Sequence, residues 1–267
     1  MKLIKALLCA TALVSTCSAL AAGPSTNKAP PAAAAQPAYS WTGFYLGAGV
    51  GGAWMQAKDR SYSTFSTSGG PNVAMNNKSD LGKFGAFGTI EAGADDQLGR
   101  FVVGAFTDFD FESLTKTKSV NKEGLYGFHS GTILIPAAYA ARHNVGYKVG
   151  DSWDAGVRLG YLLNDRNLLY ALGGYSGAQV SSGVRLSVNY GSGTANSAAA
   201  SESAWKSGYM VGAGWENALT DHITFKLEYR YADYGKATSS YATNSGSGRQ
   251  SGDVSVQSVR AVLGYKF

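Results

Sequence analysis

The end of the chain alternates strictly between two kinds of side chain. Every second residue from Val259 to Phe267 is apolar, and the run ends in Tyr265 and Phe267, whereas the residues between them include Arg260 and Lys266. Successive side chains of a β-strand point to opposite faces, so one face here would be oily and the other polar and charged. The chain repeats this pattern, which favours a barrel with an apolar outside and a wet inside.

Alternating segments recur along the whole chain after residue 40. They cover residues 43–54, 83–93, 100–111, 147–163, 168–181, 205–217, 222–234 and 258–267. Short connections lie at 94–99, 164–167 and 218–221, and long ones, rich in Ser, Thr, Gly and Asn, lie at about 56–82, 112–146, 182–204 and 235–253. An even strand number with short turns at one end and long loops at the other is typical of outer-membrane barrels. We therefore predict an all-β fold for residues 41–267: a transmembrane, eight-stranded antiparallel up-and-down β-barrel with short periplasmic turns and long extracellular loops.

The second long connection is the least regular part of this prediction. Residues 132–139 are too apolar for an ordinary loop, and a hairpin there would give ten strands. Pro136 argues against a central strand at this place, because proline cannot donate to a hydrogen-bonded ladder. We expect eight strands, with ten as the alternative.

The N-terminus predicts export. Lys2 and Lys5 precede an apolar run at 6–14, and a small-residue exit follows at 19–21, which is the pattern of a cleaved signal peptide over residues 1–22. Residues 23–40 are rich in Pro and Ala and are predicted to be a periplasmic linker. Both cysteines fall within the signal, so no disulfide is expected in the mature chain. No later run reaches the ~18 consecutive apolar residues of a transmembrane helix candidate.

The outward face of the predicted strands carries no charge through its middle. A charged side chain at the lipid midplane would cost ~2–4 kcal/mol. On the fifth segment the outward residues are expected to be Leu168, Tyr170, Leu172, Ala178 and Val180. Aromatic residues gather near the strand ends, as in the interfacial girdles of membrane proteins. The girdle at the turn end is predicted to contain Trp41, Phe44, Phe101, Tyr161, Tyr170, Phe225, Tyr265 and Phe267, and the girdle at the loop end Trp54, Trp153, Trp205, Tyr209 and Tyr231.

The inward face carries acids and bases together. We predict an interior charge network of Glu91, Asp108, Asp110, Arg158, Glu216, Lys226, Glu228, Arg230 and Arg260. These groups should pair, because an unpaired buried charge is costly. An eight-stranded barrel is just wide enough inside for its own side chains. We therefore expect a plug of ion pairs, with a gated narrow conduction path as the alternative.

Several function classes receive no support from the sequence. None of the three histidines lies on a strand beside a nucleophile, so no enzyme is predicted. The histidines are isolated and the mature chain would have no thiol, so neither a metal site nor a cofactor is predicted. The basic residues are scattered, which disfavours nucleic-acid binding. One ligand remains an alternative: His129 and His143, close to several aromatic residues in the second long loop, could hold haem.

Five motifs together resemble a known family. They are Trp41–Gly47, Leu169–Gly174, Gly212–Glu216, Lys226–Gly235 and Val259–Phe267. In combination they are similar to the small porin-family, opacity-like outer-membrane barrels of alphaproteobacteria, which include the surface antigens and haemin-binding proteins of Brucella, Bartonella and rhizobia. The resemblance covers the eight strands and not the long loops.

The resemblance implies an integral protein of the Gram-negative outer membrane with extracellular loops. It implies roles in envelope integrity and host interaction and, for some members, haemin binding or weak porin activity. Tyr265 and Phe267 resemble the terminal signal that the barrel-assembly machinery reads. One departure concerns the third segment, where the family has Gly-x-Glu-x-Asp and this chain has Gly104-Ala-Phe-Thr-Asp108, so that Phe106 replaces an inward acid.

The sequence thus predicts a structural and surface-interaction protein whose loops carry any binding. The alternatives are a narrow diffusion channel and a haemin-binding surface protein. The expected partners are outer-membrane lipid and lipopolysaccharide, the barrel-assembly machinery and, as a further option, host surface molecules or haemin, without nucleic acid.

Overall fold

The computed structural model describes residues 39–66, 72–130, 132–190 and 195–267. The predicted signal peptide at 1–22 and residues 23–38 of the predicted linker lie outside the described residues. Within the described part, no helix is long and apolar enough to cross a membrane.

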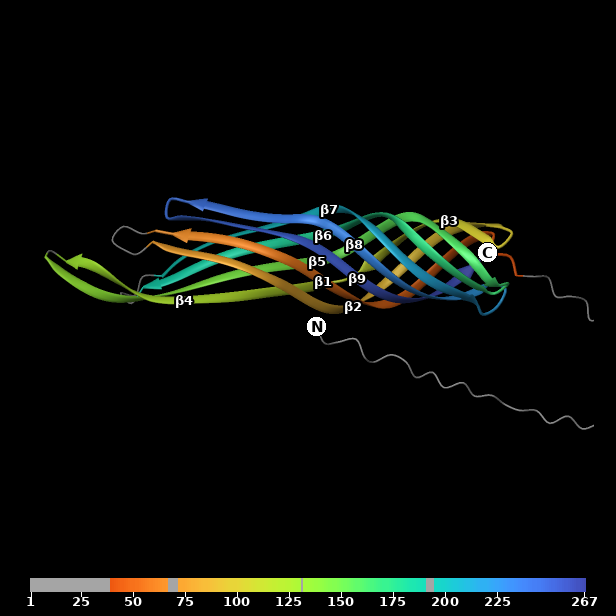
Figure 1. Cartoon of the computed structure of the whole chain (residues 1–267), viewed down its shortest axis with the longest axis horizontal. Coiled ribbons are helices and arrows are strands. Elements are labelled where there is room, and N and C mark those ends of the chain that lie inside the picture. Colours follow the sequence, from red (N-terminus) through yellow and green to blue (C-terminus); the bar gives the residue numbers. More distant parts are fainter. Residues whose placement is uncertain (1–38, 67–71, 131, 191–194) are drawn as a thin grey trace, which may run out of the picture. The chain divides into compact units, whose positions relative to one another are not determined.

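Antiparallel strands make up almost all of the described chain (Figure 1). They are β1 (Gly43–Phe65), β2 (Val73–Leu98), β3 (Phe101–Phe111), β4 (Leu114–Ser130), β5 (Ile133–Asn164), β6 (Asn167–Tyr190), β7 (Ala195–Ala218), β8 (Ile223–Thr243) and β9 (Gly246–Lys266). Hydrogen-bonded neighbours follow the order β3-β2-β1-β9-β8-β7-β6-β5-β4, and β3 also pairs with β5.

These pairings close a ring of eight strands. The first strand, β1, pairs with both β2 and β9, and the β3–β5 ladder joins the two ends of the sheet. Both β3 and β4 pair with β5, and only Glu112 and Ser113 separate them, so the two are successive parts of one strand course and β4 does not widen the ring. A ring without open edges satisfies the backbone of a sheet that faces lipid. The predicted eight-stranded antiparallel up-and-down barrel is confirmed.

The short turns and the C-terminus lie at one end of the barrel (Figure 1). The turns join β2 to β3, β5 to β6 and β7 to β8. At the same end, Phe267 donates its backbone N–H to the carbonyl oxygen of Phe44 at 3.0 Å, which closes the last strand onto the first. The predicted segregation of short turns from long connections therefore holds.

The long connections are not irregular loops, which corrects the prediction. The strands continue through most of them, and β5 alone spans 32 residues, although ~10 residues suffice to cross a membrane. A composition rich in Ser, Thr, Gly and Asn favours loops, but a strand that stands in water needs no apolar outer face. We call these continued strands, beyond the outer aromatic residues Trp54, Trp153 and Trp205, the extension.

The apolar stretch at 132–139 lies in a hairpin of the extension. Its strand residues pair with β4, so the hairpin alternative was right and the ten-strand count was wrong, because the hairpin prolongs existing strands. Pro136 is paired with Gly127 of β4, and the ladder between β5 and β6 begins only at Tyr139. Proline is tolerated there because, among the described residues, this part of β5 pairs with a neighbour on one side only.

Above the barrel the ring divides into two four-stranded sheets. The β2–β3 ladder ends at Gly88 and Phe111, and the β7–β8 ladder ends at Tyr209 and Asp233. Beyond these points, β2, β1, β9 and β8 form the first sheet, and β7, β6, β5 and β4 form the second sheet. Their inner faces pack on each other through buried Phe65, Val73, Met75, Ala141, Leu186, Val188 and Tyr190.

Backbone irregularities mark the change from barrel to two sheets. The β3–β4 break lies at Glu112 and Ser113, and the register shifts between Val149 and Ser152 on β5. On β8 a shift precedes Lys236, beside Gly235 with φ +65°. Bulges increase local twist and bend a strand, which lets one ring separate into two facing layers.

The predicted outward faces are confirmed for seven of the eight segments and wrong for the fifth. On β6, the residues Leu168, Tyr170, Leu172, Ala178 and Val180 are all buried inside, and their neighbours face outward. Alternation cannot orient this stretch, because apolar residues occupy both faces of 168–172. Part of the interior is also apolar, so hydrophobicity alone does not mark the outside.

The aromatic girdles hold apart from two members. Trp41 and Tyr170 were predicted to be outward and are buried inside, whereas the other predicted girdle residues lie on the outer surface or partly so. On β1 the outward residues from Phe44 to Trp54 are apolar, and those at 56, 58 and 60 are polar or charged. The length of this apolar band matches the ~9–11 residues of a membrane-spanning strand.

Candidate functional site

The barrel interior at the level of the apolar band is filled with ionised side chains. All nine residues predicted for the charge network are buried and lie in it: Glu91, Asp108, Asp110, Arg158, Glu216, Lys226, Glu228, Arg230 and Arg260. They come from β2, β3, β5, β7, β8 and β9, so the network links strands on all sides of the ring. The ion pairs form two clusters.

The lower cluster lies toward the short-turn end and is centred on Arg158. This guanidinium contacts both carboxylate oxygens of Asp95, with Nε 2.8 Å from Oδ1, and its Nη1 lies 2.8 Å from Oε2 of Glu216. The ammonium of Lys226 pairs with Glu91. Bidentate pairing of this kind is among the strongest charge-assisted contacts that a side chain makes, so these groups are held in fixed positions.

Two tyrosines complete the lower cluster. The guanidinium carbon of Arg158 lies 4.8 Å from the ring centre of Tyr45 and 5.1 Å from that of Tyr170. The hydroxyl of Tyr170 donates to Glu228 at 2.8 Å, and Glu228 belongs to the upper cluster. Cation–π contacts within about 6 Å are attractive, more so away from water. The tyrosines therefore fill the space between strands and connect the two clusters.

The upper cluster is built on two arginines. Nη1 of Arg230 lies 2.7 Å from Asp108 and 2.8 Å from Asp154, and its Nε contacts Glu228. Arg260 contacts both oxygens of Asp110, at 3.1 and 2.8 Å, and also lies 3.2 Å from Asp108. Arg230 thus bridges acids of β3, β5 and β8, and Arg260 holds two acids of β3 and lies 3.8 Å from Glu228 of β8. This leaves the acids little freedom to rearrange.

Phe106, the residue that departs from the family pattern, packs against this cluster. Its ring centre lies 5.0 Å from the guanidinium carbon of Arg230, and Phe87 lies 5.1 Å from that of Arg260. The aromatic rings pack on the flat faces of the guanidinium groups, and the carboxylates bind the N–H groups at their edges. The network therefore forms without an acid at position 106.

Acids outnumber bases in the described interior at this level. The eight buried acids are Glu91, Asp95, Asp108, Asp110, Glu112, Asp154, Glu216 and Glu228, and the five buried bases are Arg158, Lys226, Arg230, Arg260 and Lys266. Oxygens of Asp108, Asp110 and Asp154 lie within 4.8 Å of one another, and all three acids contact arginine. The interior is net negative and so disfavours anions.

Several members of this network are not among the residues predicted from the sequence. Asp95 was placed in a turn, but β2 continues to Leu98 and carries Asp95 to the interior. Asp154 of β5 is buried, contacts Arg230 and is not among the predicted residues. Tyr170 was assigned to the wrong face. Gly104 makes room for Asp95 in the network, because a Cβ at position 104 would lie 1.9 Å from Asp95 Oδ1.

The short-turn mouth of the barrel has a second closure. Trp41 is almost fully buried, and its Nε1 donates to the carbonyl oxygen of Asp165 in the β5–β6 turn at 3.1 Å. The ring of Tyr39 packs edge-on to it at 5.0 Å, and Gln97 accepts from the Trp41 backbone N–H at 2.8 Å. The residues preceding β1 thus cover the mouth from inside, which explains why Trp41 is absent from the girdle.

The two histidines proposed as haem ligands do not lie together. His143 is fully buried between the two sheets, where Nε2 lies 3.0 Å from Oγ of Ser63. His143 is paired with Val120 of β4. The backbone of His129 lies nine positions farther along β4, where it is paired with Leu134. Nine residues of strand span ~30 Å, so the two cannot ligate one iron in this structure. Of the His129 side chain nothing is described.

Comparison with known proteins gives a consistent result. A family model for the outer membrane protein beta-barrel domain matches residues 11–267. The 31 kDa outer-membrane immunogenic protein of Brucella melitensis is 31% identical over 89% of this chain and 88% of its own length. The 22 kDa outer membrane protein of Rhizobium leguminosarum is 33% identical over 54% of this chain and 78% of its own length.

Among solved structures, the outer membrane protein OprG of Pseudomonas aeruginosa matches with 11% identity and a TM-score of 0.43, covering 85% of this chain and 97% of that one. The ring, the girdles, the charged interior and the family match agree. The chain belongs to the outer membrane protein beta-barrel domain family and is an integral β-barrel protein of the Gram-negative outer membrane.

Proposed function

We propose that this protein is a non-enzymatic surface protein whose barrel is a closed anchor and whose extension is its working part. The barrel would contribute to envelope integrity by holding the extension rigidly above the outer leaflet. The observation that carries the proposal is the interior network, in which Arg158, Arg230 and Arg260 join acids across the ring. A protein built for diffusion has no use for a lumen crossed by fixed ion pairs.

The charge arrangement argues against the channel alternative on energetic grounds. Breaking a buried pair by removing one partner costs ~3–5 kcal/mol, and the upper arginines each hold more than one acid. A solute that passed the barrel would need to break several of these contacts at once. The covered mouth at Tyr39 and Trp41 adds a second obstacle.

Planar-bilayer recording of the purified full-length protein tests this proposal. We expect no steady channels from the wild-type protein. The double substitution Arg158→Ser with Glu216→Ser removes one base and one acid from the lower cluster and should create a leak that favours cations, since the remaining interior is net negative. Lys148→Ser, on the outer surface, serves as control. Steady wild-type conductance that the Arg158 or Glu216 substitution alters would establish a pore instead.

We propose the remaining partners from the same arrangement. The apolar band supports contact with outer-membrane lipid, and the exposed ring of Phe267 at the closing strand supports recognition by the barrel-assembly machinery. Relatives that are named outer-membrane immunogenic proteins support display at the cell surface and so contact with host molecules. Haemin capture has less support, because His143 is enclosed. A shift of the haemin Soret band that the wild-type protein produces and the His143→Ala variant does not produce would support haemin binding.

A further inference from the structure

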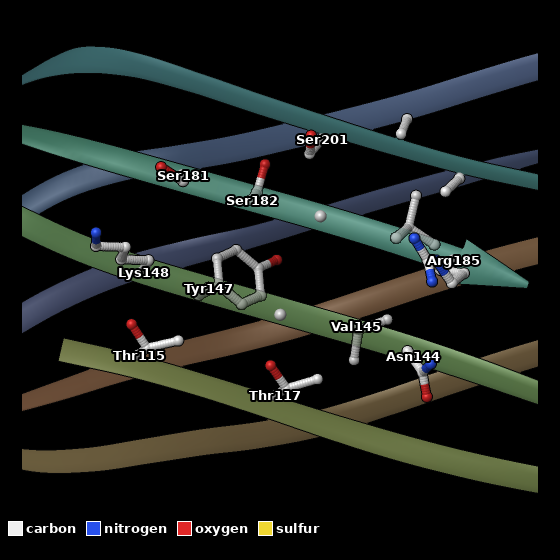
Figure 2. A pocket seen from close by; sticks show the side chains of 15 residues that line it. Thr115, Thr117, Asn144, Val145, Tyr147, Lys148, Ser181, Ser182, Arg185 and Ser201 are labelled. Carbon is white, nitrogen blue, oxygen red and sulfur yellow. The ribbon is translucent and has the colours of Figure 1, made fainter.

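The outer face of the second sheet carries a long groove. Its first hollow, of 460 Å³, lies over β4 to β7 and includes Lys148, Arg185 and Ser201 (Figure 2). A second, of 410 Å³, shares Asn144 and Arg185 with it. A third, of 580 Å³, shares Glu123, Ala140 and Asn189 with the second. The three hollows therefore follow one another along the sheet.

The strand register explains why this face is hollowed. Gly146 and Gly183 are direct partners on β5 and β6, and Thr117 and Ser201 flank them on β4 and β7. This row has no large side chain. Successive outward rows lie ~7 Å apart along a strand. The rows on either side hold Lys148 and Arg185, which Figure 2 shows, so two cations border the glycine row.

The first two hollows of the groove offer cations and hydrogen-bonding groups, and Leu125 and Tyr139 make the third more apolar. Arg142 lies one row beyond Arg185 and donates to Asn121 at 3.2 Å. Asn144 holds an oxygen with no hydrogen-bond partner among the described residues. Three cations face one acid, Glu123, in the lining of the three hollows. The excess of cations and the hydroxyl and amide groups of the first two hollows fit a hydroxyl-rich, negatively charged chain.

The position of the groove identifies the nearest ligand of that chemistry. Lys148 precedes the girdle residue Trp153 on β5 by five positions, ~15 Å of strand. The groove continues from there up the outer wall and faces sideways, along the membrane surface. What surrounds a barrel at this height is the sugar part of the outer-leaflet lipopolysaccharide. That sugar bears phosphates and carboxylates, which arginine binds in bidentate fashion.

We propose that this groove binds the acidic core oligosaccharide of neighbouring lipopolysaccharide. Lys148, Arg185 and Arg142 would contact phosphate and carboxylate groups, and the Gly146–Gly183 trough would seat a sugar ring among the hydroxyls of Thr117 and Ser201. The inference deepens the proposed surface role by naming its partner. It does not depend on whether the barrel conducts, so the conductance experiment and the binding experiment can fail separately.

Isothermal titration of the folded full-length protein in detergent tests the proposal. The probe is deacylated, phosphorylated core oligosaccharide at about 150 mM salt, where screening suppresses weak surface attraction. We expect saturable binding that the triple variant R142Q/K148Q/R185Q weakens roughly tenfold or more. Dephosphorylated probe should bind the wild-type protein more weakly. Heat-modifiable gel migration verifies that each variant is folded.

The matched control is the triple variant K58Q/R60Q/R249Q. These cations are exposed on the outer face of the first sheet, at the same level and outside the groove. We expect this variant to bind like the wild type. If both triple variants bound the oligosaccharide equally weakly, the binding would depend on the overall charge of the protein and the proposed site would be overturned. Absence of binding, or tighter binding of a sulfated heparin fragment than of the core oligosaccharide, would also overturn the proposal.

Discussion

At the scale of single residues, this protein depends on a few positions where space and charge are matched closely. Gly104 is such a position, because its missing side chain leaves room for Asp95 to reach Arg158. His143 is another, since it places a titratable ring between the two sheets, fully buried and beside Ser63. Each position gives a prediction that concerns one side chain.

Replacing Gly104 with alanine should destabilise the barrel. The new Cβ would lie 1.9 Å from Asp95 Oδ1 and 2.9 Å from the carbonyl oxygen of Ala94, so Asp95 must leave Arg158. Overpacking of this kind costs about 1–3 kcal/mol. Urea unfolding in lipid measures the change. The control is Gly173→Ala, whose nearest contact is 3.6 Å away. Equal effects of both substitutions would contradict the argument.

His143 should make stability depend on pH. Burial lowers the pKa of His143 below its ordinary value of 6.5. The unfolded chain therefore binds a proton more readily than the folded one, so this contribution to stability is complete above about pH 6.5 and is lost as the pH falls below it. We expect the free energy of unfolding of the wild type to fall more between pH 7.5 and 5 than that of His143→Gln. This pH range includes the pKa of a histidine in the unfolded chain, about 6.5. Parallel pH profiles would exclude this role.

Sequence reasoning succeeded where one face of a strand had a single chemistry. The alternation of 259–267 and of 222–234 specified their outward and inward residues correctly, because charge cannot face lipid. It failed at 168–172, where both faces are apolar. It also failed at Asp95, because an acid near a turn is equally compatible with a loop. The pairing of Arg158 with Asp95 and Glu216 depends on distances across the ring, which alternation along one strand does not contain.

At the scale of elements, the main difference between expectation and structure is the length of the strands. Outside the membrane, a strand is stabilised by its ladder and by its inner face alone, so a Ser- and Gly-rich outer face gives no strand signal. The division of the ring also leaves edges. Within the described part of the chain, β4 has a ladder partner on one side only, and its residues Lys116, Lys118 and Lys122 are exposed.

The lysines of β4 should protect this edge from association. These lysines lie on the inner face of β4, where their partners on β5 are the buried Tyr147, Val145 and Ala141, but their own side chains are exposed to solvent. Nζ of Lys122 lies 3.3 Å from the carbonyl oxygen of Ala74 on β2. Charged residues on an open edge prevent strand addition.

We expect the triple variant K116V/K118V/K122V to form dimers or larger species in detergent, measured by light scattering after gel filtration. The single variant Lys148→Val, on a strand with partners on both sides, should stay as the wild type. A monomeric triple variant would show that the edge is protected in another way.

The closing strand yields a prediction about assembly. The side chain of Phe267 is exposed beside Tyr265 at 5.1 Å between ring centres, whereas its backbone N–H bonds to Phe44. Phe267→Ser keeps the backbone bond and removes the ring. We expect less folded protein in the outer membrane of cells and unchanged refolding in detergent, both read by heat-modifiable migration. Phe44→Ser is the matched outward control. Equal loss in both assays would indicate a stability effect rather than a signal.

At the scale of the whole molecule, a closed barrel and a two-sheet extension form one continuous sheet system. Hydrogen-bonded ladders run from the periplasmic turns into the hairpins, so the extension should resist proteases although it is rich in exposed lysine and arginine. We expect trypsin applied to intact cells to leave the folded protein nearly full length, as measured on gels, and to degrade it after boiling. Rapid cleavage at Lys118, Arg142 or Arg185 on intact cells would favour the loops that the sequence suggested.

Continuation of the ladders into the extension has a consequence for immune recognition. An antibody that approaches the cell would meet corrugated walls in which adjacent side chains belong to different strands, such as Asn144 of β5 beside Arg185 of β6. Epitopes on such walls are discontinuous in sequence. Linear peptides should therefore reproduce them poorly, and a serum raised against the native protein should lose most of its reactivity when the antigen is denatured.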